Sequence, residues 1–238
     1  YLRSLKFDIM AFQETHVTDN ITDMVNAQFQ SKSSIWTVHC GMVSLSSNFI
    51  LSPNMISDND RVILSKVTHP LHSFTPFYVL NLYAPANNGT SRKSFFNNVL
   101  NAIDNLSSVV DLTRTLIMGD FNYSYSRTNL LSQTSSRWLS FLEECFFNAL
   151  TITDIHNIST FYRNTTISST IDYIFASNVM RSMTTDADLH KINSQWTDHS
   201  LLSITCTIGY SSSGPGLWRA NPLLLNVPGY HQCVQDNI

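Results

Sequence analysis

An acidic residue and an amide lie two positions apart at the end of an apolar run in the middle of the sequence. Residues 116–118 are apolar and predict a buried strand, which Gly119, Asp120, Phe121 and Asn122 follow directly. Because side chains alternate along an extended segment, we expect Asp120 and Asn122 to share one face. A strand end holds side chains rigidly, and Gly119, which lacks a Cβ atom, permits a close backbone approach. Such a pair could orient a water molecule and a phosphate oxygen together.

Four further apolar runs also end in polar side chains that could do chemistry. They end at Glu14, at Tyr83, at Asp172, and at the adjacent pair Asp198 and His199. Taken singly, each has an ordinary explanation, because a carboxylate at a strand end usually meets solvent or caps a turn, and a tyrosine there is usually an edge aromatic. The order and context of all five positions together favour a shared site.

The polar positions need strands to hold them, and the hydrophobic pattern supplies several. We predict strands over residues 7–12, 62–67, 77–83, 159–162, 170–175 and 201–208, with two shorter β-rich runs around Gly41 between residues 35 and 51. Three helices are predicted between them: residues 20–29, a helix that Thr90 or Ser91 caps and that continues to Leu106, and residues 137–148. Strands therefore outnumber helices, and the two kinds are interspersed.

Length and composition bound the domain organisation. At 238 residues and 43% hydrophobic content, the chain suits one globular domain, residues 1–208. A cluster of serine, glycine and proline at 211–216 predicts a joint, so residues 209–238 form a tail. No apolar stretch approaches the roughly 18 to 20 residues that a membrane span requires. Nothing at the start resembles a signal peptide, and because residue 1 is tyrosine we expect the natural chain to begin upstream.

The charge balance alone does not indicate a nucleic-acid binder. The net charge is −3 and the pI about 6.2, so the broad basic surface typical of such proteins is not expected. The fold could still gather some scattered basic residues beside the acidic site: Arg61, Lys66, Arg92, Lys93, Arg114, Arg127, Arg137, Arg163 and Arg181. The four cysteines are widely spaced without a Cys-x-x-Cys pair, which argues against structural zinc and fits reduced thiols in the nucleus or cytoplasm.

Five short motifs, in this order, resemble the endonuclease/exonuclease/phosphatase superfamily of metal-dependent phosphoesterases. They are Gln13-Glu14-Thr15, Asn81-Leu82-Tyr83-Ala84-Pro85, Gly119-Asp120-Phe121-Asn122, Ser169-Thr170-Ile171-Asp172-Tyr173 and Thr197-Asp198-His199. The resemblance covers residues 7–207 and implies an α+β fold, a four-layer sandwich in which two packed, mostly antiparallel β-sheets are flanked by helices. It places the site where the strand ends of both sheets meet. It also implies that the family's first strand, which carries a metal-site asparagine, is missing before Tyr1.

The resemblance implies roles for the acidic residues. Glu14 and Asp198 match the metal-binding positions, and the ion would be Mg²⁺, with Mn²⁺ as an alternative. Asp120 matches the residue that orients or deprotonates the attacking water, and Asn122 matches one that helps to hold the phosphate. Asp172 matches a supporting residue that forms hydrogen bonds within the site or aids the leaving group.

The resemblance implies roles for the remaining matching residues as well. His199 would lie against the scissile phosphate as a cation or proton carrier, with its pKa raised by neighbouring carboxylates. Tyr83 would donate a hydrogen bond to the phosphate or to the leaving oxygen. Thr197, where the family usually has serine, and Thr160 are implied substrate-binding residues.

Several segments have the form found in the endonuclease domain of LINE-type (non-LTR) retrotransposons. They are residues 13–16, residues 82–85 and the pair Thr160-Phe161. Residues 214–221 resemble the stretch that joins that domain to a reverse transcriptase, so a reverse transcriptase domain downstream is an implied partner, beside the DNA substrate.

The sequence thus predicts a Mg-dependent phosphodiesterase from a retrotransposon-like open reading frame, which nicks one DNA strand by water attack on phosphorus. Two alternatives remain open: a phosphatase or phospholipase of the same superfamily, and an inactive retroelement remnant.

Overall fold

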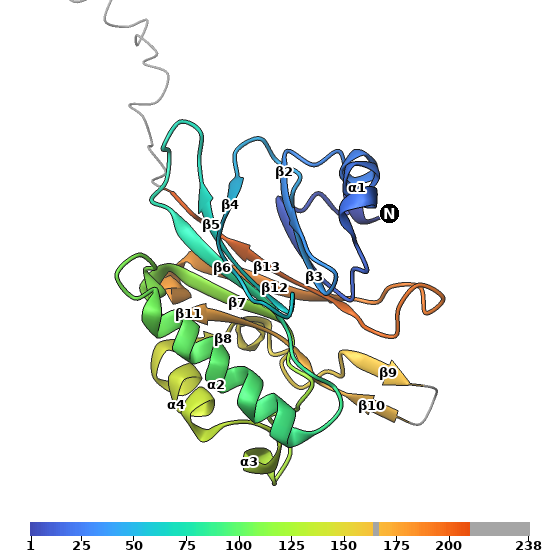
Figure 1. Ribbon diagram of the computed structural model, residues 1–238, viewed down its shortest axis with the longest axis vertical. Coiled ribbons are helices and arrows are strands. Elements are labelled where there is room, and N and C mark those ends of the chain that lie inside the picture. Colours follow the sequence, from blue (N-terminus) through green and yellow to red (C-terminus); the bar gives the residue numbers. More distant parts are fainter. Residues whose placement is uncertain (164–166, 210–238) are drawn as a thin grey trace, which may run out of the picture.

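A six-stranded β-sheet forms the centre of the computed structural model, which describes residues 1–163 and 167–209 (Figure 1). Across this sheet the strands follow the order β4, β5, β6, β7, β11, β8, and only β6 and β7 run parallel. Helix α2 (Gly89–Asn105) connects these two strands, which is the kind of crossover that a parallel pair requires. The bounds are β4 Ile50–Ile56, β5 Val62–Thr68, β6 Phe77–Tyr83, β7 Thr115–Asp120, β8 Phe146–Asn148 and β11 Asp172–Ser177.

A second layer of β-structure packs on one face of the large sheet. It contains a three-stranded sheet in the order β1, β3, β2 and the antiparallel pair β12 and β13. Both parts contribute apolar side chains to one core cluster with the large sheet, among them Met42 from β3 and Ile204 from β13. The bounds are β1 Ile9–Gln13, β2 Ser33–Trp36, β3 Cys40–Ser44, β12 Thr184–His190 and β13 Leu201–Cys206.

Helices cover the outer faces of the two β-layers (Figure 1). Helix α2 and helix α4 (Ser136–Cys145) bury their apolar stripes against the large sheet, with Phe96 and Trp138 stacked at 4.6 Å between ring centroids. Helix α1 (Thr22–Phe29) packs Phe29 against Phe12 and Trp36 of the small sheet. The predicted α+β fold, two sheets flanked by helices, is confirmed.

Shorter elements complete the described chain. Strands β9 and β10 form a small hairpin that projects from the body of the molecule, and α3 is a single turn (Figure 1). The bounds are β9 Phe161–Arg163, β10 Ile167–Ser169 and α3 Leu130–Gln133, with 3₁₀ helices at Leu2–Leu5, Asp19–Ile21, Leu112–Arg114, Ala149–Thr153 and Asn178–Met183.

Alternation along the central strands determines what faces the space between the sheets. On β6, Tyr78, Leu80 and Leu82 belong to the core under the helices, whereas Phe77 and Val79 belong to the core between the sheets. The period of two puts the remaining odd-numbered residues of β6 on the inter-sheet face as well. That face is where the polar strand ends gather.

A fully buried asparagine ties the two sheets together at this point. Asn81 of β6 donates its amide hydrogens to the carbonyl oxygens of Phe12 (3.0 Å) and Gly41 (2.9 Å), and it accepts a hydrogen bond from Gln13 (2.6 Å). Each hydrogen bond satisfies a group that would otherwise be buried without a partner. Asn81 therefore fixes the ends of β1 and β3 against β6.

Several element boundaries differ from the sequence-based predictions. The helix predicted over residues 137–148 ends at Cys145, because residues 146–148 pair as strand β8 with β11. Asn88, not Thr90 or Ser91, caps α2, with its side-chain oxygen accepting the Ser91 backbone N–H. The prediction covered only the first residues of strand β4, because Pro53 follows them. The strand continues through Pro53 because it lies at the edge of the sheet and has a register shift there.

Three smaller observations bear on the other predictions. None of the helices in residues 1–163 and 167–209 is long and apolar enough to span a membrane. Cys40, Cys145 and Cys206 are free thiols. The predicted tail lies outside the described residues from position 210 onward.

Candidate active site

The ends of β6 and β7 and the beginning of β11 lie side by side and bring their polar residues to one edge of the large sheet. In the strand registers, Tyr83 of β6 pairs with Asp120 of β7, and Asp120 pairs with Asp172 of β11. Adjacent strands lie about 4.8 Å apart, so the three side chains form a row on the inter-sheet face. This arrangement is fixed by backbone pairing and by the core on either side of the sheet.

Gly119 makes the close pairing of β6 and β7 feasible. Its φ angle is +136°, and a Cβ atom at this position would lie 1.9 Å from the carbonyl oxygen of Leu82. Only glycine fits such a backbone conformation and such a contact. The expectation that Gly119 permits a close backbone approach is confirmed.

Asp120 and Asn122 come together by a different route from the one that we expected. Strand β7 ends at Asp120, Phe121 points into the core, and Asn122 adopts a left-handed conformation with φ of 51°. The turn lets Asn122 donate its backbone N–H (2.8 Å) and its side-chain amide (2.9 Å) to the Asp120 carboxylate, and the same amide also donates to Ala84. A local turn, and not the alternation of an extended strand, therefore joins the pair.

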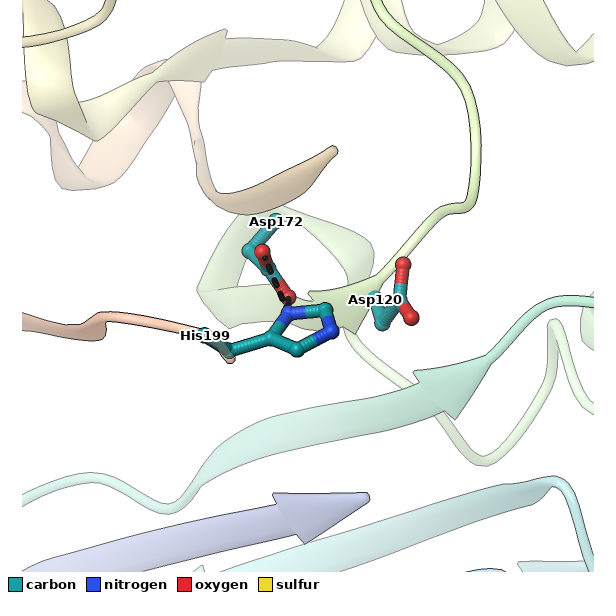
Figure 2. A group of neighbouring side chains, drawn as sticks. All are labelled: Asp120, Asp172 and His199. Atoms are coloured by element: carbon teal, nitrogen blue, oxygen red, sulfur yellow. Dashed lines mark hydrogen bonds and ion pairs between the residues drawn. The ribbon is translucent and has the colours of Figure 1, made fainter. Parts of the chain in front are cut away.

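The imidazole of His199 lies between two carboxylates (Figure 2). Its Nδ1 is 3.1 Å and 3.0 Å from the two oxygens of Asp172, and Asp120 lies on the other side of the ring. One ligand atom from each of Asp120, Asp172 and His199 lies within 4.8 Å of the others. The structure thus brings together three residues that are 52 and 27 positions apart in the sequence.

Burial and charge shift the proton affinities of two members of this group. Burial and the negative charge of Asp172 raise the pKa of Asp120 to about 8. Burial by itself lowers the pKa of His199, but the hydrogen bond to Asp172 and the charges of Asp172, Asp120 and Asp198 outweigh it and raise the pKa to about 9. At neutral pH His199 is therefore a cation, and Asp120 can exchange a proton.

Thr160 contacts this group through the Asp172 carboxylate. It is fully buried, and its hydroxyl donates to the Asp172 carboxylate at 2.6 Å while accepting the backbone N–H groups of Ile171 and Asp172. Its carbonyl oxygen accepts the N–H of Ser200, which fixes the segment that carries His199. These contacts let Thr160 position Asp172 and His199, and its predicted substrate-binding role stays a prediction.

Glu14 and Tyr83 form a second group at the same edge. Glu14 follows β1 with a left-handed φ of 54° and presents an exposed carboxylate, to which the Tyr83 hydroxyl donates. Burial and this bond to Glu14 raise the pKa of Tyr83 to about 12, so the phenol keeps its proton across the physiological range. The guanidinium of Arg61 lies over the Tyr83 ring, 4.5 Å from its centroid.

The last two predicted residues lie at the exposed rim of the site. The side chain of Asp198 is 56% exposed, and its carboxylate is 3.8 Å from Nε2 of His199. Thr197 is half-buried, and its hydroxyl accepts the backbone N–H of His199 at 3.1 Å. Their roles, like those of the other site residues, stay predictions.

The sequence analysis named Asn81 and Arg61 but did not predict their contacts at the site. Asn81 belongs to a motif that we quoted, but nothing in the sequence distinguishes a buried amide that joins two sheets from an ordinary strand residue. Arg61 was one of the scattered basic residues that the fold could have gathered, and it alone among them contacts Tyr83 within the described part of the chain.

Comparisons with known proteins agree with this geometry. The model of the endonuclease/exonuclease/phosphatase family matches residues 1–199. The "Transposon TX1 uncharacterized 149 kDa protein" of Xenopus laevis is 25% identical over 252 aligned positions, which cover 99% of this chain. The chain spans only 19% of the length of that relative.

Solved structures share the fold at low sequence identity. An AP endonuclease from Archaeoglobus fulgidus superposes with a TM-score of 0.65 at 18% identity, over 86% of this chain and 91% of that one. A 3′ phosphatase from Neisseria bound to a product DNA hairpin gives a TM-score of 0.60 at 15% identity, over 85% and 89% of the two chains.

Proposed function

Because the chain belongs to the endonuclease/exonuclease/phosphatase family, we propose that it is a phosphodiesterase that uses a divalent metal ion to nick one strand of DNA. The observation that carries this proposal is the group of Asp120, Asp172 and His199 between the sheets. A buried acid and an imidazole with pKa values near 8 and 9 suit proton transfer close to neutral pH.

The similarity to a transposon protein supports a retrotransposon-like context. Because the alignment covers nearly the whole chain, including positions beyond the described residues, we propose that this nuclease is one unit of a larger open reading frame product. The reverse transcriptase predicted to follow it would be the partner within that product.

The donors available here suit a hard cation such as Mg²⁺ or Mn²⁺. One oxygen of the exposed Glu14 carboxylate accepts the Tyr83 hydroxyl, which leaves the other for an ion, and Asp198 offers a second exposed carboxylate. Glu14 and Asp198 would hold the metal. When bound, it would supply positive charge that offsets the charge of the phosphate in the transition state.

The protein's own residues would carry the remaining steps. In its ionised form, which becomes more populated as the pH rises toward 8, Asp120 takes a proton from the water whose oxygen attacks phosphorus, and the carboxamide of Asn122 orients that carboxylate. The imidazolium of His199 stabilises the negative charge that accumulates on the phosphate. Tyr83 donates a hydrogen bond to a phosphate oxygen or to the oxygen that departs as the P–O bond breaks. The departing oxygen takes its proton from Tyr83 in the second case and from solvent water in the first.

Nicking of supercoiled plasmid tests the proposal. We expect this chain, in parallel with a version extended upstream by the predicted first strand, to convert supercoiled to open circular DNA in Mg²⁺ or Mn²⁺ and to stop in chelator. Glu14→Ala should need a higher metal concentration for the same rate. Undiminished nicking in chelator would contradict the role of the metal.

Two further outcomes would favour the alternative functions. A folded protein that leaves plasmid intact but hydrolyses inositol phosphates, sphingomyelin or a 3′-phosphate would contradict the endonuclease assignment. A folded protein that is inert on all of these substrates would be an inactive remnant.

Thr160→Val should lower the nicking rate by about tenfold to a hundredfold, because the isosteric side chain keeps the packing but removes the hydrogen bond that orients Asp172. Burying the N–H groups of Ile171 and Asp172 without an acceptor should also lower the free energy of unfolding by about 1 to 3 kcal/mol in urea titrations. Thr160→Ser retains the hydroxyl and should recover most of the rate. Equal losses in the valine and serine variants would show that the methyl group, and not the hydrogen bond, matters.

A further inference from the structure

Arg61 is held rigidly beside Tyr83 at the edge where the site lies. Its carbonyl oxygen accepts the backbone N–H of Tyr83 at 2.9 Å, just before β5 begins. Its guanidinium covers the tyrosine ring at 4.5 Å from the centroid and donates Nη1–H to the Tyr83 carbonyl oxygen at 3.4 Å. These contacts with Tyr83 fix the plane of the guanidinium, and among residues 1–163 and 167–209 its N–H groups donate to no other residue.

Within the described part of the chain, the charge of Arg61 has no carboxylate as an ion-pair partner. Among residues 1–163 and 167–209, no carboxylate forms an ion pair with it, although the side chain is half-buried. Asp60, Glu14, His39 and His16 lie in the same neighbourhood, but the Glu14 carboxylate already accepts the Tyr83 hydroxyl. A partly desolvated guanidinium with free donors and a fixed plane is suited to a carboxylate or phosphate.

The position of Arg61 relative to Asp120 indicates which anion it would meet. Arg61, Tyr83 and Asp120 follow one another across three adjacent strands, β5, β6 and β7. Two strand spacings amount to roughly 10 Å, which is about three nucleotides of rise along a DNA strand. Because the Arg61 backbone lies on the far side of Tyr83 from Asp120, its guanidinium suits a neighbouring phosphate of the same polymer better than the phosphate attacked beside Asp120.

We infer that Arg61 binds a phosphate of the substrate strand other than the one that is hydrolysed, so that the site selects a phosphodiester polymer over small phosphate esters and lipid headgroups. This inference rests on the proposed function and specifies the substrate class of the same site. Arg61 would then supply positive charge that a protein of net negative charge needs beside its carboxylates in order to bind a polyanion.

The test compares Arg61→Gln and Arg61→Lys with Lys66→Gln, a control that removes one charge near the other end of the same strand, β5. Binding of a short labelled DNA duplex is measured in chelator over a range of salt concentrations, without turnover. Arg61→Gln should weaken binding about tenfold and reduce the slope of log K against log salt by about 1, whereas Arg61→Lys should keep that slope. Lys66→Gln should bind like the wild type.

Hydrolysis of bis(p-nitrophenyl) phosphate, a small diester, separates phosphate binding from a structural role. Arg61→Gln should lower kcat/KM for this substrate by at most about threefold, less than the loss with DNA. Equal losses on both substrates would mean that Arg61 only positions Tyr83, and unchanged DNA binding would mean that it meets no phosphate; either result overturns the inference. Failure of the proposed function would instead appear in the wild type, as plasmid that stays supercoiled. The DNA-binding comparison would still show whether Arg61 binds a phosphate.

Discussion

Asp120→Asn is expected to reduce plasmid nicking by about a thousandfold, because the amide cannot accept the proton of the attacking water. The substitution preserves size and still offers an oxygen to the backbone N–H of Asn122. It gives up the bond from the Asn122 side-chain amide, which still donates to Ala84, so the loss should come mainly from chemistry and not from misfolding. Initial rates of open-circle formation at saturating Mg²⁺ measure it. Retention of more than a tenth of the wild-type rate would contradict the role of Asp120 as the base.

The same substitution should stabilise the fold at alkaline pH. Burial and the charge of Asp172 raise the pKa of Asp120 to about 8, well above its ordinary value of 3.8, so the folded state keeps a proton that the unfolded state releases between these pH values. The wild type therefore loses stability as the pH rises from about 4 to 8, whereas asparagine does not titrate. Above pH 8 the free energy of unfolding of the variant should exceed that of the wild type by an amount on the order of a few kcal/mol.

Thermal unfolding in chelator at pH 5 and pH 9 checks this expectation without interference from metal binding. The advantage of Asp120→Asn should be small at pH 5 and large at pH 9. Asp58→Asn, at an exposed position, serves as the matched control and should change little at either pH. A variant that is less stable than the wild type at pH 9 would show that Asp120 is held mainly by favourable contacts to its charged form.

The sequence was sufficient to locate these polar residues because each borders an apolar run that predicts a buried strand: Tyr83 and Asp120 end theirs, and Asp172 begins its own. Tyr83, Asp120 and Asp172 were predicted in this way, and their strands β6, β7 and β11 are neighbours in the large sheet. The pairing itself was not predictable from pattern, since the register of strands some 37 to 52 positions apart depends on turns and packing elsewhere.

Other features depend on tertiary contacts that leave no local signature. Strand β12 is rich in threonine and aspartate, and it forms because β13 offers a complete set of backbone partners. The left-handed turn at Asn122 is stabilised by the Asp120 carboxylate and the Ala84 carbonyl, so its conformation appears only once those groups are assembled. The contact between Arg61 and Tyr83 arises from the pairing of β5 with β6 in the same manner.

Gly119→Ala is expected to be the most destabilising single methyl group that can be added near the site. The new Cβ atom would lie 1.9 Å from the carbonyl oxygen and 2.9 Å from the carbonyl carbon of Leu82, and both are backbone atoms within a parallel strand pair. Neither strand can move away without breaking its hydrogen bonds and the cores on both faces. We expect a loss of more than about 4 kcal/mol, which is a large share of the roughly 5 to 15 kcal/mol by which a folded domain is stable.

Gly209→Ala separates the clash from the backbone strain. Gly209 also has a positive φ, +123°, but the nearest atom to its Cβ position would be 3.4 Å away. The alanine there should cost only the strain of an unfavourable conformation, about 1 to 3 kcal/mol. Urea titrations followed by far-UV circular dichroism compare the two variants. Similar losses would mean that β6 and β7 can separate at Gly119, and the rigid row of Tyr83, Asp120 and Asp172 on which the site depends would then be adjustable.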